Sequence, residues 1–444
     1  MLRLGSIVFL VTFFAYLVQS LFFFGDNADE LMAVPLALVL GGAVGFFLHR
    51  NTADEDAEIQ TGLFFWAYSL RLLCGQLFYG WGFSSIVGDE DASGYSFAWK
   101  YVDNWYNNGF DGLISDFVSV FFTNQNIGQG LIWAFPNALA GGPSRMIVSV
   151  VNCFAGALLV IVLFRLCRRL FDSNTATISA TLLTFWPSMI LFSAWTTKEI
   201  LVILFEWTTL YLIVRTPGGI KLKDGITAIP FMLGVLITRF YASYMIFATF
   251  IFRVLTAGGK NQVRNFVFGS MVIGAMGIFL LASGVINRDF ERIERHQNMM
   301  SDWRENVSEH TGSGIDVYSQ IDSAPLAVPV ATVYFFLSPF PWEVFSGSAR
   351  SSFGAIENIA IIIILILGFP AIKIFFKDRF FDLLPIFVFC GLYAGMHIWV
   401  LANAGIAWRH KQTVMPLFFM LVAVAYTQRD AAWKLLTGKK EKEI

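Results

Sequence analysis

The sequence predicts an all-α membrane protein with about 10–12 transmembrane helices. Of its 444 residues, 56% are hydrophobic and 14% are charged, which is too apolar for a soluble domain. Apolar runs of about twenty residues, the length of a helix that crosses a bilayer, recur along the chain. Most of the 31 Lys and Arg residues fall in alternate connections between these runs, so those connections are expected on the cytoplasmic side.

Ten apolar runs are predicted to span the membrane. They are 5–24, 31–49, 62–85, 146–166, 176–195, 198–215, 266–286, 356–373, 380–401 and 412–428. The first run is too long for the apolar core of a signal peptide, so it is expected to be a retained anchor.

Two further apolar segments are predicted to be broken. Segment 226–253 is long for one helix and holds Arg239 at its middle, so we expect two short helices that turn back there and bring the charge to water or a cavity. Segment 326–350 is interrupted by Pro339 and Pro341, which favours a re-entrant or interfacial segment.

This layout places both termini in the cytoplasm and two long loops on the outer side of the membrane. The first loop, 86–145, is rich in aromatic residues such as Trp99 and Trp105, which suits amphipathic helices that lie on the bilayer surface. Four parts are therefore predicted: an N-terminal hairpin at 1–50, a core at 51–286 that includes the first loop, a second outer loop at 287–355 with the broken segment, and C-terminal helices with a basic tail at 356–444.

Composition and motifs exclude several function classes. The net charge of −1 gives no reason to expect nucleic acid, and no GxxxxGK loop suggests a nucleotide-driven pump. The four cysteines have no CxxC spacing and fall in or beside apolar runs, so they are expected to be buried thiols. They are Cys74, Cys153, Cys167 and Cys390.

Three acids, Asp89, Glu90 and Asp91, stand together where the third span leaves the membrane on the outer side. They could simply end a helix in a solvated loop. Alternatively, crowded carboxylates raise one another's pKa, which suits a base that takes a proton. Their hard oxygen atoms would also suit Mg²⁺ or Mn²⁺, with Asp89 and Asp91 as the tentative ligands.

Cationic residues occur at several span ends on the same predicted face. Lys198 and Glu199 lie in a turn between two spans, Arg239 lies at the predicted helix break, and Arg409 and Lys411 precede the last span. Each has an ordinary reading, such as a snorkelling lysine or a solvated helix end. Their shared face instead suggests a site for the phosphate of a lipid, since basic pockets at this depth suit such head groups.

The order of these features resembles the GT-C superfamily of polyprenyl-phosphate-dependent membrane glycosyltransferases. The resemblance rests on "GDEDASGY", on the paired spans that end in "WTTKEI", and on "GVLITRFYASYMI". It covers roughly residues 62–286 and is looser beyond them, where "SPFPWE" and the set Gly405, Arg409, Lys411 and Pro416 occur. The family places its acidic motif after the first span, whereas here the motif follows the third.

The resemblance implies roles for these residues. Asp89 would be the catalytic base, with Glu90 or Asp91 orienting the acceptor or binding a metal, and Tyr95 would begin the surface helix behind them. The lipid phosphate would be held by Lys198, Arg239, Arg409 and Lys411. The donor would be a polyprenyl-linked sugar and the acceptor a glycan or lipid, in a pathway of polysaccharide assembly for the cell envelope. The active site would lie at the outer face of a bacterial cytoplasmic membrane.

Three alternatives stay open. A polymerase or ligase of lipid-linked oligosaccharides would use basic residues of the second outer loop, which are Arg292, Arg295, His296 and Arg304. In the transferase itself, the acceptor or substrate is expected to meet Tyr95, Glu199, Arg292, Arg295 and His296. A transporter or flippase of lipid-linked glycans is disfavoured by the lack of an internal repeat. A purely structural membrane protein is the third alternative, and it would not explain why charged residues cluster on the predicted outer face.

Overall fold

The computed structural model describes residues 2–24, 28–51, 54–79, 81–82, 92–122, 127–216, 219–256, 324–345, 349–401 and 403–428. Within these ranges the chain is helical and contains no β-strand, which confirms the predicted all-α class. The chain divides into two compact units. Unit 1 holds Met1–Arg215 and Gly225–Ser243, and unit 2 holds Thr216–Asp224 and Tyr244–Ile444. The predicted four-part division stays a prediction.

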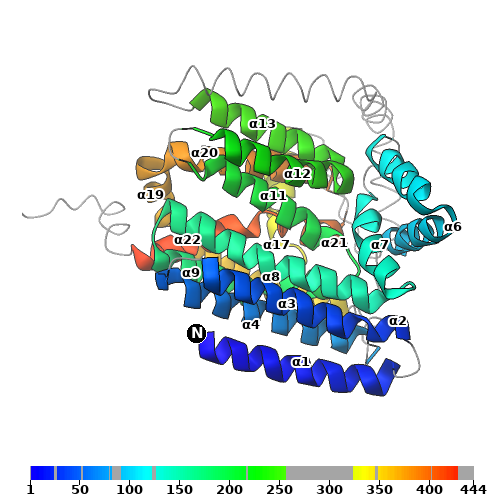
Figure 1. The fold of residues 1–444 in the computed structure, drawn as a ribbon. Helices are drawn as coiled ribbons and strands as arrows, with labels where there is room; N and C mark the ends of the chain where they lie inside the picture. The colour runs from blue at the N-terminus through cyan, green and yellow to red at the C-terminus, as the bar shows by residue number, and fades with distance from the viewer. Residues whose placement is uncertain are drawn as a thin grey trace, which may run out of the picture. The chain divides into compact units, whose positions relative to one another are not determined.

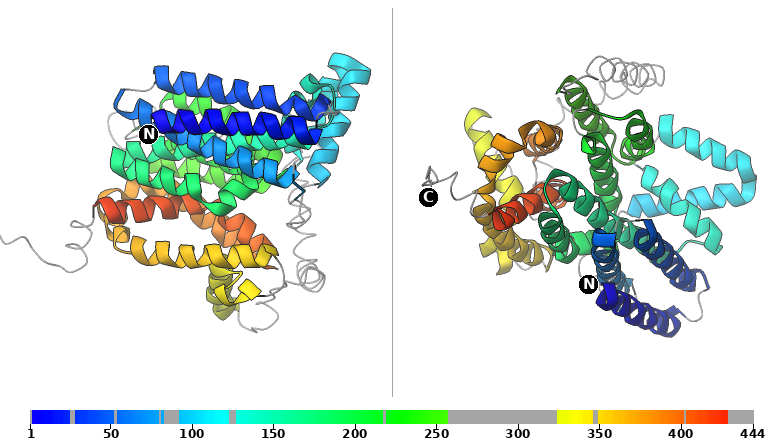
Figure 2. Two further views of the ribbon diagram at one scale, coloured as in Figure 1. Left: turned by 90° about the horizontal axis from the view of Figure 1, so that it is seen from below. Right: turned by 60° about the vertical axis from the view of Figure 1, so that its left-hand side comes forward.

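Unit 1 is a bundle of apolar helices with two further helices at one end. Helices α1 (Leu2–Phe24), α3 (Ala33–Asn51), α4 (Asp54–Tyr79) and α8 (Arg145–Leu170) lie side by side (Figures 1 and 2). Short helix α2 (Ala28–Leu31) joins α1 to α3. The remaining helices of the unit are α6 (Ala92–Phe122), α7 (Gly128–Ala140), α9 (Ser173–Phe185), α10 (Pro187–Ala194), α11 (Glu199–Val214) and most of α12 (Leu222–Thr238).

Local sequence explains where several of these helices begin. Ser144 caps α8, because its hydroxyl accepts a hydrogen bond from the amide of Ile147. The Glu30 carboxylate accepts from the Ser144 hydroxyl and the Met146 amide, which places a negative charge at the positive end of α8. Asp172 caps α9 in the same way, through the amide of Thr175.

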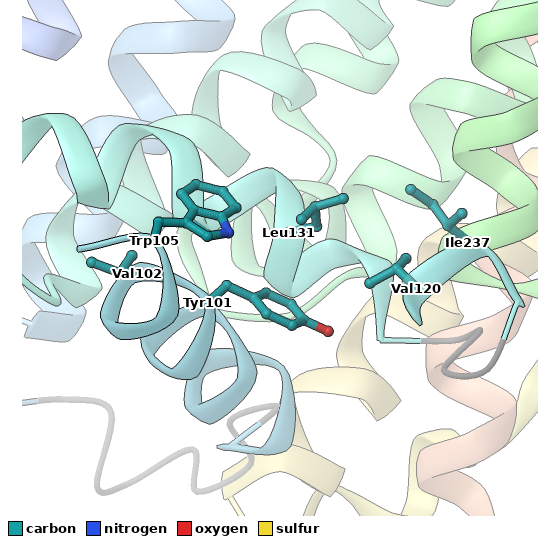
Figure 3. Close-up of a cluster of buried hydrophobic side chains, with 7 residues drawn as sticks. Tyr101, Val102, Trp105, Val120, Leu131 and Ile237 are labelled. Atoms are coloured by element: carbon teal, nitrogen blue, oxygen red, sulfur yellow. The ribbon is translucent and has the colours of Figure 1, made fainter. Parts of the chain in front are cut away.

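The first predicted outer loop forms helices α6 and α7, which pack on each other at one end of the bundle (Figure 1). Helix α6 is kinked at Gly109, whose φ of 58° favours glycine. Tyr101 and Trp105 of α6 meet Leu131 of α7 and Ile237 of α12 in a buried cluster (Figure 3). These contacts attach the pair to unit 1, while its position on a bilayer surface stays a prediction.

Four described helices are long and apolar enough to cross a membrane: Leu2–Phe22 of α1, α3, α8 and α20 (Phe380–Trp399). The number rises to six if two bent pairs each count as one span. These pairs are α9 with α10, bent by 57°, and α18 (Ala349–Gly368) with α19 (Ala371–Asp378), bent by 58°. The predicted span 266–286 lies outside the described residues, so the total of about 10–12 stays a prediction.

The structure changes the interpretation of one apolar segment and agrees with the predicted breaks in two others. The predicted span 176–195 is not straight, because it breaks at Trp186 before Pro187. The predicted break at Arg239 is confirmed: α12 ends at Thr238 and α13 (Phe240–Thr256) begins at Phe240. The charge of Arg239 does not reach water there, because its side chain is buried. Segment 326–350 contains α17 (Ala324–Leu337), a cis Ser338–Pro339 bond and the 3₁₀ helix η1 (Pro341–Phe345).

Unit 2 contains α17 to α20, then α21 (Ala404–Lys411) and α22 (Met415–Thr427). Helix α18 packs on α22 and η1, and α17 packs on α20 and α21. Arg253 of α13 is buried in this unit, where it donates to the Thr216 carbonyl and lies 3.8 Å from the Asp382 carboxylate.

Candidate functional site

The turn that joins α10 to α11 is the best-defined part of the candidate site. Asn152 of α8 is buried below it and donates from Nδ2 to the carbonyls of Trp195 and Thr197, at 2.8 and 2.9 Å. The Nε1 of Trp133 donates to the other end of the same amide, Asn152 Oδ1, at 3.1 Å. One buried side chain therefore satisfies two carbonyls of the turn and is itself held in a fixed orientation.

Tyr79, the last residue of α4, holds the turn from another direction. Its hydroxyl accepts from the Thr196 amide at 3.0 Å and donates to the Thr196 hydroxyl at 3.2 Å. Ser149 of α8 donates to the carbonyl of Ala194, just before the turn, at 2.7 Å. Residues 194–197 are therefore bonded to both α4 and α8, which fixes the start of α11.

Glu199 and Arg239 form a buried ion pair beside this turn. Arg239 Nη2 donates to Glu199 Oε1 at 3.1 Å, and each side chain is only 3% exposed. Glu199 is the first residue of α11, where a negative charge also suits the helix dipole. The sequence placed Glu199 toward the acceptor, but in the structure this carboxylate fixes the guanidinium of Arg239.

Lys198 precedes Glu199 and is half-buried at the N-cap position of α11. Together Lys198, Glu199 and Arg239 carry a net formal charge of +1, since the group holds two cations and one carboxylate. Residues 40 positions apart in sequence are thus brought together at one place in unit 1. This convergence is the part of the predicted site that the described residues display.

The predicted acids Asp89, Glu90 and Asp91 lie outside the described residues, while Tyr79 and Tyr95 on either side of them have contacts in unit 1. On one side, α4 ends at Tyr79, which is bonded to Thr196 in the turn before Lys198. On the other side, the half-buried ring of Tyr95 lies under the Arg145 guanidinium, 5.3 Å from the ring centre. The last described residue of α4, Tyr79, thus lies next to the turn that carries Lys198.

Lys411 does not have the environment of a phosphate-binding lysine. It is fully buried in unit 2, where its ammonium donates to the carbonyls of Phe336 and Ser338 and to Asn358 Oδ1. An ammonium has three N–H donors, so these bonds use all of them. Arg409, two residues earlier, is half-buried. The predicted phosphate role of Lys411 is therefore replaced by a structural one, the anchoring of the cis Ser338–Pro339 turn.

Other predicted site residues lie beyond the described part of the chain. Arg292, Arg295 and His296 of the second outer loop are among them, as are both predicted metal ligands. Within the described ranges, no group of three or more His, Cys, Asp or Glu side chains could hold a metal ion. The metal and the role of the second loop stay predictions.

The sequence did not single out the residues that build this site. Asn152, Tyr79 and Trp133 stand in apolar runs, and their partners are between 19 and 117 positions away. A polar side chain at the centre of an apolar span, such as Asn152, was the available signal, because such a group must find a partner within the protein.

A comparison with known protein families matches the part of the chain that holds this site. Residues 128–286 match the family model described as dolichyl-phosphate-mannose-protein mannosyltransferase, and the matched segment includes Lys198, Glu199 and Arg239. No curated protein matches the chain.

One solved structure is similar, that of the oligosaccharyltransferase of Archaeoglobus fulgidus in the apo form. The identity is 14% and the TM-score 0.45, over 84% of this chain and 52% of that one, so we draw no argument from it. The chain spans about half the length of that oligosaccharyltransferase. The family match, over residues 128–286, confirms the predicted resemblance of this chain to the GT-C superfamily.

Proposed function

We propose that this protein is a GT-C-type glycosyltransferase that uses a sugar linked to polyprenyl phosphate or diphosphate. The acceptor would be a glycan or lipid at the outer face of a bacterial cytoplasmic membrane. The observation that carries the proposal is the buried ion pair of Arg239 with Glu199 at the start of α11, directly after Lys198, within the segment that matches the mannosyltransferase family.

The proposed reaction divides its work between acids and cations. An acceptor hydroxyl attacks the anomeric carbon of the donor sugar, and the bond from that carbon to the phosphate oxygen breaks. The Asp89 carboxylate would take the hydroxyl proton as the new glycosidic bond forms. Lys198 and Arg239 would stabilise the negative charge that grows on the leaving phosphate.

Glu199 has a defined part in this arrangement. A buried arginine is costly without a counter-charge, and Glu199 supplies one through Nη2 of Arg239. The pair also fixes the plane of the guanidinium, and a fixed fork of donors suits bidentate contact with phosphate. The net charge of the group stays positive because Lys198 adds a second cation.

A metal would fit the same scheme. If Mg²⁺ or Mn²⁺ binds, Asp89 and Asp91 would hold it, and its charge would stabilise the phosphate oxygens. Lys411 takes no part, since its donors are used within unit 2.

The test is sugar transfer by the purified protein in lipid nanodiscs, with polyprenyl-phosphate-linked and polyprenyl-diphosphate-linked sugars as donors. We expect Asp89→Asn to abolish transfer, and Lys198→Gln and Arg239→Gln to raise the donor KM or lower kcat at least about tenfold, the effect of losing one charged contact. Lys221→Gln is the matched control, because Lys221 is exposed and precedes α12, whereas Arg239 follows that helix. Full activity in Asp89→Asn would refute the proposal, and activity only with lipid-linked oligosaccharides would favour a polymerase or ligase.

A further inference from the structure

Arg71 lies in α4 and is fully buried within unit 1. Its guanidinium makes four hydrogen bonds. Nε donates to Ser193 Oγ at 3.1 Å, Nη1 to the Ala67 and Thr184 carbonyls at 3.0 and 3.3 Å, and Nη2 to the Leu183 carbonyl at 3.3 Å. Two of these acceptors belong to the last turn of α9, and Ser193 belongs to α10. One arginine therefore bonds to both helices of the bent pair.

The carbonyls that Arg71 contacts are those that the helix break leaves open. In a continuous helix, the Leu183 carbonyl would accept from the amide of residue 187, but Pro187 has no N–H. Trp186 is in the extended conformation, with φ −70° and ψ 118°, as expected for a residue before proline. The last carbonyls of α9 consequently lack partners of their own helix, and they form the negative end of its dipole.

The neighbouring residues leave room for this guanidinium. A side chain at Gly156 of α8 would place its Cβ 2.6 Å from Arg71 Nε, and closer still to Ser193 Oγ. Ser193 in turn donates to the Met189 carbonyl in α10, so it links Arg71 to the helix that follows the bend. Cys153 of α8 also contacts the Ser193 carbonyl, at 3.5 Å.

The position of α10 decides the position of the site. Helix α10 has eight residues and ends at Ala194, directly before the turn that carries Lys198 and Glu199. If α9 and α10 formed one straight helix, the turn would leave Asn152 and Tyr79, which hold the Thr197 carbonyl and the Thr196 amide. The bend and the site are thus connected through a short and rigid element.

We propose that Arg71 is a positioning residue: its guanidinium replaces the N–H that Pro187 lacks, holds the bend between α9 and α10, and so places Lys198 and Glu199 beside Arg239. The catalytic part of this inference rests on the proposed glycosyltransferase function. The structural part, which concerns the place of the turn, does not.

The test combines Arg71→Met with Pro187→Ala, and it reads both activity and amide hydrogen exchange in nanodiscs. In Arg71→Met we expect the amides of residues 188–199 to exchange about tenfold faster, because buried carbonyls lose their donors, while the amides of α3 change little. In the double variant, the new N–H at residue 187 can bond to the Leu183 carbonyl. The amides near the break should again be protected from hydrogen exchange. Sugar transfer should not recover, since a straighter α9–α10 segment would move the turn that carries Lys198 and Glu199.

Each outcome distinguishes this role from a general structural one. Faster exchange throughout unit 1 in Arg71→Met would overturn the proposal, because Arg71 would then support the whole bundle and not the bend. Recovery of both protection and activity in the double variant would overturn it as well. Arg71→Lys should lie between wild type and Arg71→Met, since an ammonium has three donors for four acceptors. If wild-type protein transfers no sugar from either donor, the exchange data still test the role of Arg71 in placing the turn.

Discussion

The buried pair of Glu199 and Arg239 gives the sharpest quantitative prediction. The perturbation is Glu199→Gln, which keeps the size of the side chain and removes its charge. Both side chains are 3% exposed and their charged atoms are 3.1 Å apart, so the remaining guanidinium would be an uncompensated buried cation. Loss of one partner in such a pair costs about 3–5 kcal/mol in the free energy of unfolding.

The assay is a double-mutant cycle of Glu199→Gln and Arg239→Met, with the free energy of unfolding measured in mixed micelles by circular dichroism. Each single variant should be destabilised by about 3 kcal/mol or more, whereas the double variant leaves no buried charge and should lose much less than the sum. We expect a coupling free energy of at least about 2 kcal/mol.

The chain offers a matched control in the pair Arg168–Asp56, at 3.0 Å, whose side chains are 40% and 14% exposed. Asp56→Asn should cost at most about 1 kcal/mol, because water screens an exposed pair. The reasoning would be refuted if Glu199→Gln cost no more than Asp56→Asn, or if the coupling free energy of the buried pair were near zero.

Three further predictions follow from the described contacts. Lys411→Met should lower the free energy of unfolding by about 2 kcal/mol or more, since three buried acceptors lose their hydrogen-bond donor. The KM for the lipid-linked sugar should stay unchanged in the folded enzyme. A raised KM would show that Lys411 belongs to the phosphate site. Gly156→Ala should lower the free energy of unfolding by about 1–3 kcal/mol, because the added Cβ clashes with Arg71 and Ser193. Gly42→Ala is the control: its added Cβ meets nothing within 4 Å, so the variant should be as stable as wild type or more stable in the same assay. Burial raises the pKa of Tyr101 to about 12, whereas an unfolded tyrosine titrates near pH 10. The contribution of Tyr101 to the free energy of unfolding is therefore fully present below pH 10 and is lost as the pH rises toward 12. Tyr101→Phe should flatten this part of the pH–stability profile, and an unchanged profile would contradict the prediction.

Much of the fold could be predicted because it depends on local pattern. Long apolar runs gave the helices of the bundle, and a charge in the middle of an apolar segment gave the break at Arg239. The bend at Pro187 was also within reach of local rules, since a residue before proline avoids the helical conformation. It was missed because the hydropathy of 176–195 continues across the proline without interruption.

The contacts of the site were harder to predict. Arg71 and Ser193 are separated by 122 positions, and Lys411 and Asn358 by 53, so their pairing depends on how the helices pack. Sequence alone therefore grouped Lys411 with the other cations of one face, whereas packing places it against three buried acceptors. Sequence reasoning also gave Glu199 and Arg239 separate roles, although a buried arginine needs a nearby carboxylate or a set of carbonyls, and the structure pairs the two.

The central claim is that Asp89, Lys198 and Arg239 serve one site for a lipid-linked sugar. The most direct measurement is an experimental structure of the protein in nanodiscs with a non-hydrolysable analogue of a polyprenyl-phosphate-linked sugar. We predict that the phosphate lies within hydrogen-bond distance, about 3 Å, of Lys198 or Arg239, and that the Asp89 carboxylate faces the sugar. A phosphate bound away from both cations, or an Asp89 carboxylate that faces away from the sugar, would contradict the account.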